Sequence, residues 1–473
     1  MKLPPLFIER TERLLGKETS QVLLDALGDE MPTAIRLNRL KTDLMPIGDF
    51  VDAPVSWCEH GYYLKRRPNF TFDPLFHAGL YYVQEAASMF VSEVIRRLVD
   101  SPVTMLDLCA APGGKSTAVR QSLPEGSVLF CNEPMVHRAA VLAENISKCG
   151  HPDVVVTRNL PAAYRSSGLR FDVILCDVPC SGEGMFRKDE MAIEGWSEDH
   201  VKEMAHLQRT IIEDIWPCLS PGGLLIYSTC TFNAEENEEN LQWIMANFDA
   251  TLLTIETDPA WGIRSSAKPE LGRGVYRFIP GFTRSEGLCM AVLRKGGTPS
   301  DLPTMKHEKK RNRKDRKAAS MGDVVELRNG LLSADDFVLH AIGESLMAVP
   351  KRWFDRYEQA VDKLHVLQGG VPVACRKGTS WIPDNALALS SAFNPNGFPA
   401  VDLDDRQALA YLRKESMALP AGTPRGYVVV TYRNHPLGFV KNIGNRANNL
   451  LPQEWRIKST YLPDDNQNIT IFP

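Results

Sequence analysis

The chain has 473 residues, 44% of them hydrophobic and 24% charged, which is typical of a globular protein with two to four domains. A formal net charge of −4 does not point to a nucleic-acid binder. No apolar run is long enough to span a membrane and the first residues contain no secretory signal, so we expect a cytoplasmic protein without membrane contact.

The ten cysteines form no Cys-x-x-Cys pair, which argues against a zinc site or a thioredoxin-like motif. A reducing compartment also argues against disulfides, so we expect no bound metal and mostly buried thiols. Cys180 and Cys230 are set apart because each follows a predicted strand.

Residues 1–80 mix short helical and extended patterns and are predicted to form a small N-terminal α+β domain that binds RNA. The alternating basic stretch Ile35–Lys41 fits an edge strand that faces RNA. A strand with a solvated face fits that stretch equally well.

Residues 81–296 are predicted to form an α/β, Rossmann-like domain with a doubly wound parallel sheet. Short apolar runs, typical of strands buried on both faces, alternate with helix-length segments such as Met135–Lys148 and Glu198–Cys218. Ligands are expected at the carboxyl ends of the strands. The apolar runs are Val103–Leu108, Val128–Cys131, Val154–Val156, Val173–Cys176 and Leu224–Tyr227.

Residues 297–325 are predicted to be a basic linker, since Lys306–Lys317 has eight Lys or Arg against two Asp or Glu. A solvated linker and a segment attracted to RNA phosphates are equally good interpretations. Residues 326–473 are predicted to form a separate C-terminal region. In it, Tyr427–Tyr432 and Leu437–Lys441 flank a turn and predict a β-hairpin.

The loop after the first strand of the α/β domain predicts a cofactor site. A Walker A loop needs glycine where Cys109 stands, and a dinucleotide fingerprint needs three spaced glycines where this loop has an adjacent pair. S-adenosylmethionine needs fewer glycines, because it has no phosphates, but it needs a carboxylate for the ribose hydroxyls. Glu133 ends the next strand about 20 residues on, as one βαβ step requires. We therefore predict that S-adenosylmethionine is bound by Glu133 and by Cys109, Ala110, Ala111, Pro112, Gly113, Gly114 and Lys115.

Cys180, in Asp177-Val178-Pro179-Cys180, and Cys230, in Ser228-Thr229-Cys230, follow two predicted strands and should meet at the carboxyl edge. An isolated cysteine is more often a buried, inert thiol, but two at equivalent strand ends favour catalysis. A thiolate that adds to carbon 6 of cytosine makes carbon 5 nucleophilic enough to accept a methyl group. Asp177 would hold the exocyclic amine and the ring nitrogen of that base.

Four segments resemble the signatures of the NOL1/NOP2/Sun RNA 5-methylcytosine methyltransferases: Tyr82–Met89, Ala110–Lys115, Asp177–Gly182 and Ser228–Thr231. The resemblance runs through most of residues 30–295. It implies that Cys230 attacks the base and that Cys180 helps to release the product. We predict that Asp177 contributes to both the catalytic and the cofactor site.

The hairpin residues His435–Gly438 resemble the PUA-like RNA-binding end of a bacterial subfamily that modifies small-subunit ribosomal RNA. The resemblance implies 16S ribosomal RNA or the small ribosomal subunit as partner. Transfer RNA as substrate, or a non-catalytic ribosome-assembly factor, are the alternatives. We take a monomer as the default.

One departure from the family pattern lies in the predicted cofactor site. Asn159 stands where the family usually has an aspartate that holds adenine, and its amide is still expected to hydrogen-bond. Arg187 and Lys188 are candidates for RNA phosphate contacts. A solvated pair at a helix start explains them equally well.

Overall fold

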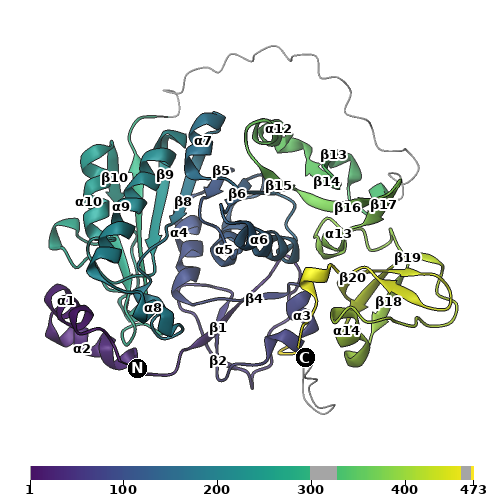
Figure 1. Cartoon of the computed structure of the whole chain (residues 1–473), viewed down its shortest axis with the longest axis horizontal. Helices are drawn as coiled ribbons and strands as arrows, with labels where there is room; N and C mark the ends of the chain where they lie inside the picture. The colour runs from purple at the N-terminus through teal and green to yellow at the C-terminus, as the bar shows by residue number, and fades with distance from the viewer. Residues whose placement is uncertain (1, 299–326, 460–469) are drawn as a thin grey trace.

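The computed structural model describes residues 2–298, 327–459 and 470–473 (Figure 1). The basic segment Lys306–Lys317 lies outside these residues. Along the described parts of the chain, no helix is both long and apolar enough to cross a membrane.

The N-terminal unit is a helical pair followed by an antiparallel sheet in the order β2-β3-β1-β4. The edge-strand prediction for Ile35–Lys41 is wrong, because β1 lies between β3 and β4 and all of its residues are buried. Arg36 is tolerated there because it donates to side-chain oxygens of Gln84 and Thr117. The elements are α1 (Pro5–Leu15), α2 (Lys17–Ala26), β1 (Thr33–Leu37), β2 (Val51–Pro54), β3 (Gly61–Leu64), α3 (Pro74–His77) and β4 (Tyr81–Val83).

The predicted doubly wound α/β domain is confirmed. Within the described residues its sheet has the order β10-β12-β9-β8-β5-β6-β7-β15, with β11 beside β12 and with β15 formed by Val366–Gly369. The strands β9, β8, β5, β6 and β7 are parallel, and the order turns back at β5. The strands are β5 (Thr104–Asp107), β6 (Val128–Asn132), β7 (Val154–Thr157), β8 (Phe171–Asp177), β9 (Leu219–Thr229), β10 (Ala250–Leu253), β11 (Val275–Phe278) and β12 (Leu288–Lys295).

Helices cover both faces of this sheet, because successive strand residues point to opposite sides. Met105 and Leu129 belong to the core cluster that includes residues of α4, α5 and α6, whereas Leu106 and Phe130 belong to the one that includes residues of α7, α9 and α10. The helices are α4 (Phe90–Leu98), α5 (Gly114–Ser122), α6 (Val136–Cys149), α7 (Pro161–Ser167), α8 (Glu190–Glu194), α9 (Glu198–Ile215) and α10 (Glu238–Asn247).

Part of the predicted C-terminal region is built into this sheet. The strand β15 (Val366–Gly369) pairs antiparallel with β7, with Val366 opposite Thr157. The helix α12 (Phe354–Lys363) packs beside α7 on one face. Residues 354–369 therefore extend the α/β layers, although they follow the predicted linker.

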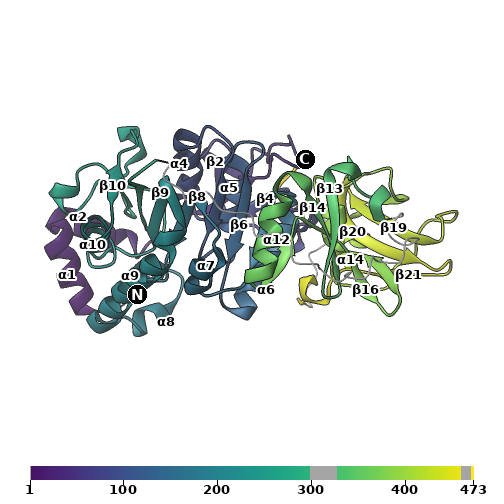
Figure 2. The same ribbon diagram turned by 90° about the horizontal axis from the view of Figure 1, so that it is seen from above.

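The rest of the C-terminal region holds two four-stranded sheets, at the opposite end of the molecule from α1 and α2 (Figure 2). The predicted hairpin is confirmed as β19 and β20, with Arg433 and Asn434 at φ 49° and 64° in its turn. The last residues return to the N-terminal unit, where the Ile471 amide donates to Asp73 (Figure 1). The elements are β13 (Phe337–Ile342), β14 (Ser345–Pro350), β16 (Val371–Lys377), β17 (Ser380–Pro383), α13 (Asn385–Leu389), β18 (Ala400–Leu403), α14 (Asp405–Leu412), β19 (Gly426–Tyr432), β20 (His435–Asn442) and β21 (Ala447–Asn449).

Candidate active site

The two cysteines singled out from the sequence lie side by side at the carboxyl ends of β8 and β9. Their Sγ atoms are 3.1 Å apart, and the Cys230 amide donates to the Cys180 sulfur at 3.4 Å. Both residues are partly exposed. The hydrogen bond with Cys230, together with burial, raises the pKa of the Cys180 thiol well above its usual range. Cys180 therefore stays protonated over the pH range in which an ordinary cysteine ionises.

Asp177 links the cysteine pair to the cofactor loop. Its carboxylate accepts from Lys115 Nζ at 3.0 Å on one oxygen and from Ser228 Oγ at 2.7 Å on the other. About a third of the side chain is exposed, at 30%. The two contacts fix the orientation of the carboxylate and leave it open to a ligand.

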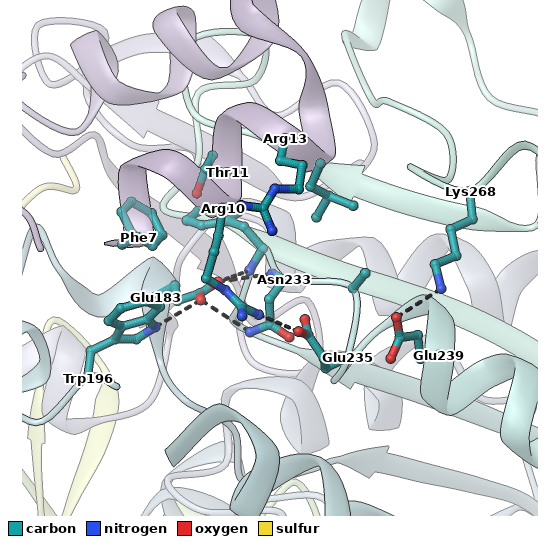
Figure 3. A pocket seen from close by; sticks show the side chains of 13 residues that line it. Phe7, Arg10, Thr11, Arg13, Glu183, Trp196, Asn233, Glu235, Glu239 and Lys268 are labelled. Atoms are coloured by element: carbon teal, nitrogen blue, oxygen red, sulfur yellow. Dashed lines mark hydrogen bonds and ion pairs between the residues drawn. The ribbon is translucent and has the colours of Figure 1, made fainter. Parts of the chain in front are cut away.

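A buried carboxylate, Glu183, braces the backbone that follows Cys230. One oxygen accepts from the Thr231 hydroxyl at 2.6 Å and from the amides of Phe232 and Asn233, at 2.7 and 3.0 Å. The other accepts from Trp196 Nε1 at 3.0 Å (Figure 3). Because Glu183 follows Cys180 by three residues, it ties one cysteine loop to the other.

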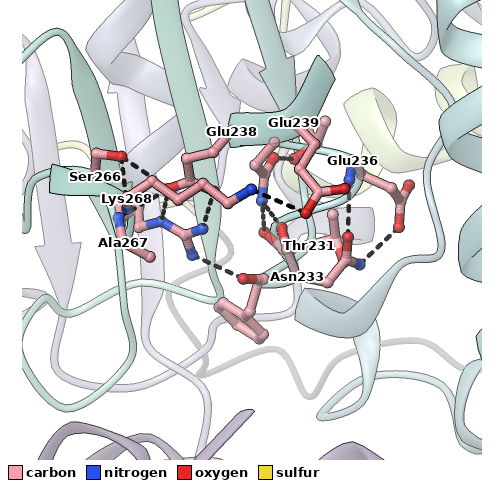
Figure 4. A network of polar contacts seen from close by, with 12 residues as sticks. Thr231, Asn233, Glu236, Glu238, Glu239, Ser266, Ala267 and Lys268 are labelled. Carbon is pink, nitrogen blue, oxygen red and sulfur yellow. Dashed lines mark hydrogen bonds and ion pairs between the residues drawn. The ribbon is translucent and has the colours of Figure 1, made fainter. Parts of the chain in front are cut away.

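Glu236 forms a second brace (Figure 4). It accepts from the Ser181 amide at 3.0 Å, from Gln208 at 2.7 Å and from Asn233 Nδ2 at 2.8 Å. Its side chain is fully buried. Ser181 and Thr231, the residues after the two cysteines, are also joined through their hydroxyls at 2.9 Å. The cysteine pair is thus held by hydrogen bonds from several directions.

A cavity of about 230 Å³ lies behind this network, between α1 and the residues after Cys230 (Figure 3). Phe7 on α1 packs edge-on against Phe186 and Trp196. Neither Cys180 nor Cys230 lines the cavity, which therefore lies where α1 packs and apart from the cysteine pair. Its lining includes Arg10, Arg13, Leu14, Phe232, Glu235, Glu239 and Lys268.

The predicted cofactor loop runs from the end of β5 into α5. The Ala110 amide donates to Asn132 O at 2.8 Å, and the Ala111 carbonyl accepts from Arg138 at 3.0 Å. Gly113 has φ of +113°, where a Cβ would be strained, and it precedes α5, which begins at Gly114. Pro112 is exposed, whereas burial raises the pKa of Cys109.

The side chains at this edge fit S-adenosylmethionine. Glu133 is 2% exposed, and its carboxylate accepts from the Met135 amide at 3.0 Å. A carboxylate held in this way could accept hydrogen bonds from ribose hydroxyls. Asp107 Oδ1 is buried and has no hydrogen-bond partner in the described part of the chain. Exposed apolar side chains follow β6 and β7, which suits the faces of a purine. They are Met135, Val136 and Leu160.

Three predicted binding residues make contacts within the chain. Asn159 lies at the carboxyl end of β7, where its side-chain amide bonds the main chain of His365. Arg187 donates to the Ser285 carbonyl at 3.2 Å, and Lys188 pairs with Glu286. The roles predicted for these three residues stay predictions.

Glu183, Glu236 and Asn233 were not among the residues predicted from the sequence. Each lies three to six positions after Cys180 or Cys230, but the stretch after Cys230 is rich in Asn and Glu, so no single one stands out in the sequence. Asp107 was also missed, because it stands inside a strand pattern.

Three family models match the chain. They are the N-terminal domain of 16S rRNA methyltransferase RsmF (residues 3–86), 16S rRNA methyltransferase RsmB/F (residues 99–294) and the methyltransferase RsmF PUA domain (residues 398–457). Ribosomal RNA small subunit methyltransferase F of Serratia proteamaculans is 31% identical, over 96% of both chains. The Escherichia coli O81 protein of the same name is 31% identical over 89% of each.

The chain belongs to the RsmF family of rRNA methyltransferases. This confirms the family resemblance and the fold class, including the PUA-like C-terminal end. As a family member the protein is a methyltransferase whose methyl donor is S-adenosylmethionine.

Solved structures agree with this fold. A methyltransferase homologue from Pyrococcus horikoshii is 28% identical with a TM-score of 0.52, covering 61% of this chain and 94% of that one. NSun6 from the same organism, solved with SFG, is 20% identical with a TM-score of 0.52, covering 62% and 99%. The latter supports the fold alone.

Proposed function

We propose that this RsmF-family protein methylates carbon 5 of a cytosine in 16S ribosomal RNA through a covalent bond between Cys230 and carbon 6 of the base. The observation that carries the proposal is the contact of Cys180 and Cys230, 3.1 Å apart, beside the Asp177 carboxylate. Two thiols at a parallel-sheet edge suit nucleophilic attack and assisted release better than they suit packing.

The chain's own residues account for each step of this reaction. S-adenosylmethionine, held by the loop 109–115 and Glu133, would supply an electrophilic methyl group. The Cys230 thiolate adds to carbon 6, and the electron pair of the 5,6 double bond becomes available at carbon 5, which takes the methyl group. Asp177, held by Lys115 and Ser228, would accept a hydrogen bond from the exocyclic amine. A proton shared between Asp177 and the ring nitrogen would neutralise the charge that the addition places on that nitrogen.

Release requires that the proton on carbon 5 passes to solvent, which reaches the partly exposed cysteine pair, and that the bond to Cys230 breaks. The electrons of the C–H bond then re-form the 5,6 double bond, and the sulfur departs as a thiolate. Cys180 contacts the departing sulfur, so we assign it the release step. The raised pKa of Cys180 suits a group that stays protonated beside a thiolate.

The proposed substrate follows from the relatives named ribosomal RNA small subunit methyltransferase F and from the matched PUA domain. The target base must leave its stack, which costs a few kcal/mol, and RNA contacts must offset that cost. We assign these contacts to the N-terminal unit, the C-terminal region and Arg187 with Lys188. Because Lys188 pairs with Glu286, a phosphate would have to displace that carboxylate.

The test is methyl transfer from isotope-labelled S-adenosylmethionine to 16S ribosomal RNA, to the small subunit and to transfer RNA, followed by nucleoside mass spectrometry. We expect labelled 5-methylcytosine in 16S ribosomal RNA or the small subunit, and none with Cys230→Ala. Label in transfer RNA alone would favour the tRNA alternative. Binding of RNA without any label would favour a ribosome-assembly factor.

A further inference from the structure

The strand β15 forms one edge of the methyltransferase sheet, although it belongs to the C-terminal region. It comes from beyond residue 326, yet it pairs with β7 from Gly369 opposite Val155 to Val366 opposite Thr157. Beyond that ladder the Arg158 amide donates to the His365 carbonyl at 2.9 Å. The C-terminal region thus reaches the carboxyl end of β7, where the sheet presents its cofactor edge.

The side-chain amide of Asn159 bonds the main chain of His365 through both its nitrogen and its oxygen. Its Nδ2 donates to the His365 carbonyl at 3.3 Å, and its Oδ1 accepts from the His365 amide at 3.0 Å. A carboxylate at this position supplies only acceptors and would face the His365 carbonyl with its negative charge. The contact with β15 therefore explains why an asparagine stands where the family usually has an aspartate.

The same residue is fixed to the cofactor side of the sheet. Asn132 Oδ1 accepts from the Asn159 amide at 2.9 Å, and Asn132 Nδ2 donates to the Asn159 carbonyl at 2.9 Å. Asn132 directly precedes Glu133, the ribose-binding candidate, whose amide donates to Thr157 O at 3.2 Å. The peptide link between Glu133 and Asn132, and the hydrogen bonds from Asn132 to Asn159 and from Asn159 to His365, thus connect Glu133 to His365.

We propose that the C-terminal region completes the S-adenosylmethionine site, with Asn159 as a positioning residue that latches His365 to the end of β7. Cofactor binding and docking of β15 are then coupled, so each strengthens the other. Asn159 acts on the cofactor through the position of His365 and the loop after β7. The inference rests on the use of S-adenosylmethionine and is independent of the proposed cytosine chemistry.

The decisive variant is Asn159→Asp, because the latch and a direct adenine contact predict opposite results. If Asn159 only held adenine, the family's usual aspartate would bind S-adenosylmethionine equally well or more tightly. The latch predicts that the Kd for S-adenosylmethionine, measured by calorimetry without RNA, rises at least about fivefold. An unchanged or lower Kd overturns the proposal.

A matched control separates the latch from general loosening of the C-terminal region. Asp153, at the amino end of β7, accepts from Trp353 Nε1 at 2.8 Å and pairs with Arg352, so it holds the same region far from the cofactor edge. Asp153→Asn should lower the melting temperature and raise the Kd for S-adenosylmethionine less than Asn159→Asp does. An equal rise in Kd in both variants contradicts a latch at Asn159.

Hydrogen exchange of the unmodified protein gives a readout that does not depend on any variant folding. Adding S-adenosylmethionine should slow hydrogen exchange of the amides in residues 365–369. The expected factor is the one by which docking of β15 strengthens cofactor binding. The strand β10, at the other edge of the sheet, should not respond. Equal exchange in residues 365–369 with and without S-adenosylmethionine overturns the coupling.

Discussion

The two halves of the carboxyl edge are stabilised differently. The catalytic half, after β8 and β9, is braced from within by Glu183 and Glu236, which both stand close in sequence to the cysteines they support. The cofactor half, after β5, β6 and β7, is braced in part from remote segments. Tyr82 of the N-terminal unit lies against Gly114, and His365 bonds Asn159.

This difference indicates a division of labour. The groups that we propose to react are held by a buried hydrogen-bond network among residues 181–240. The cofactor half contacts the flanking units. We therefore expect the docking of those units to change the affinity for S-adenosylmethionine. Variants in the two halves should therefore separate methyl transfer from cofactor affinity.

The largest expected effect is on the catalytic half. Cys230→Ala should lower the methylation rate at least about 10³-fold, because the neighbouring Cys180 thiol stays protonated and does not replace it as the nucleophile. The Kd for S-adenosylmethionine should stay within about twofold. Single-turnover methylation and calorimetry measure the two quantities. A variant that methylates at the wild-type rate would remove Cys230 from the mechanism.

Glu183→Gln tests the internal brace. Its amide would place a donor among the N–H and O–H groups that now point at the carboxylate, which costs about 1–3 kcal/mol of unfolding free energy. We expect kcat to fall about tenfold with little change in the Kd for S-adenosylmethionine. Chemical denaturation and methylation kinetics give both values.

The matched control is Glu239→Gln, since Glu239 is 41% exposed and pairs with Lys268 on the rim of the same network (Figure 4). An exposed pair contributes about 0–1 kcal/mol. If Glu239→Gln reduced kcat as much as Glu183→Gln, the brace would have no special role.

The cofactor half should show a pH dependence through Asp107. Burial raises the pKa of Asp107 to about 7, above its ordinary value near 3.8. The folded state therefore holds a proton that the unfolded state has lost, so stability falls as pH rises from about 4 through 7. Asp107→Asn should lose less unfolding free energy than the wild type between pH 5.5 and 8. Urea denaturation at each pH measures this unfolding free energy. The same pH dependence in the variant and the wild type would contradict the prediction.

The smallest expected effect concerns RNA. Lys188→Ala should raise the Kd for RNA about two- to threefold and reduce the salt slope of binding by about one. Lys202, 65% exposed and paired with Asp199 on α9, is the control. A salt slope that falls equally in both variants would exclude a specific phosphate contact at Lys188.

The sequence predicted the catalytic half well because its chemistry lies in short motifs at strand ends. Cys180, Cys230 and Asp177 were brought together as expected, because parallel strands end at one edge. The hairpin at residues 426–442 was readable from its pattern for a similar local reason.

What the sequence did not predict depends on contacts between distant segments. The strand β15 lies beyond the predicted linker, and no local pattern tells which sheet it joins. The position of β1 inside its sheet was missed because Arg36 looked solvated, whereas it is satisfied by Gln84 and Thr117 from other elements. Both failures concern partners remote in the chain.

The most direct test of the central claim is to express Cys180→Ala in bacteria and look for RNA that stays attached under denaturing conditions. If Cys230 attacks and Cys180 releases, the variant accumulates a covalent RNA complex, and adding Cys230→Ala abolishes it. Sequencing the attached RNA identifies the methylated cytosine. The account is contradicted if Cys180→Ala turns over like the wild type without an adduct, or if the adduct survives in the double variant.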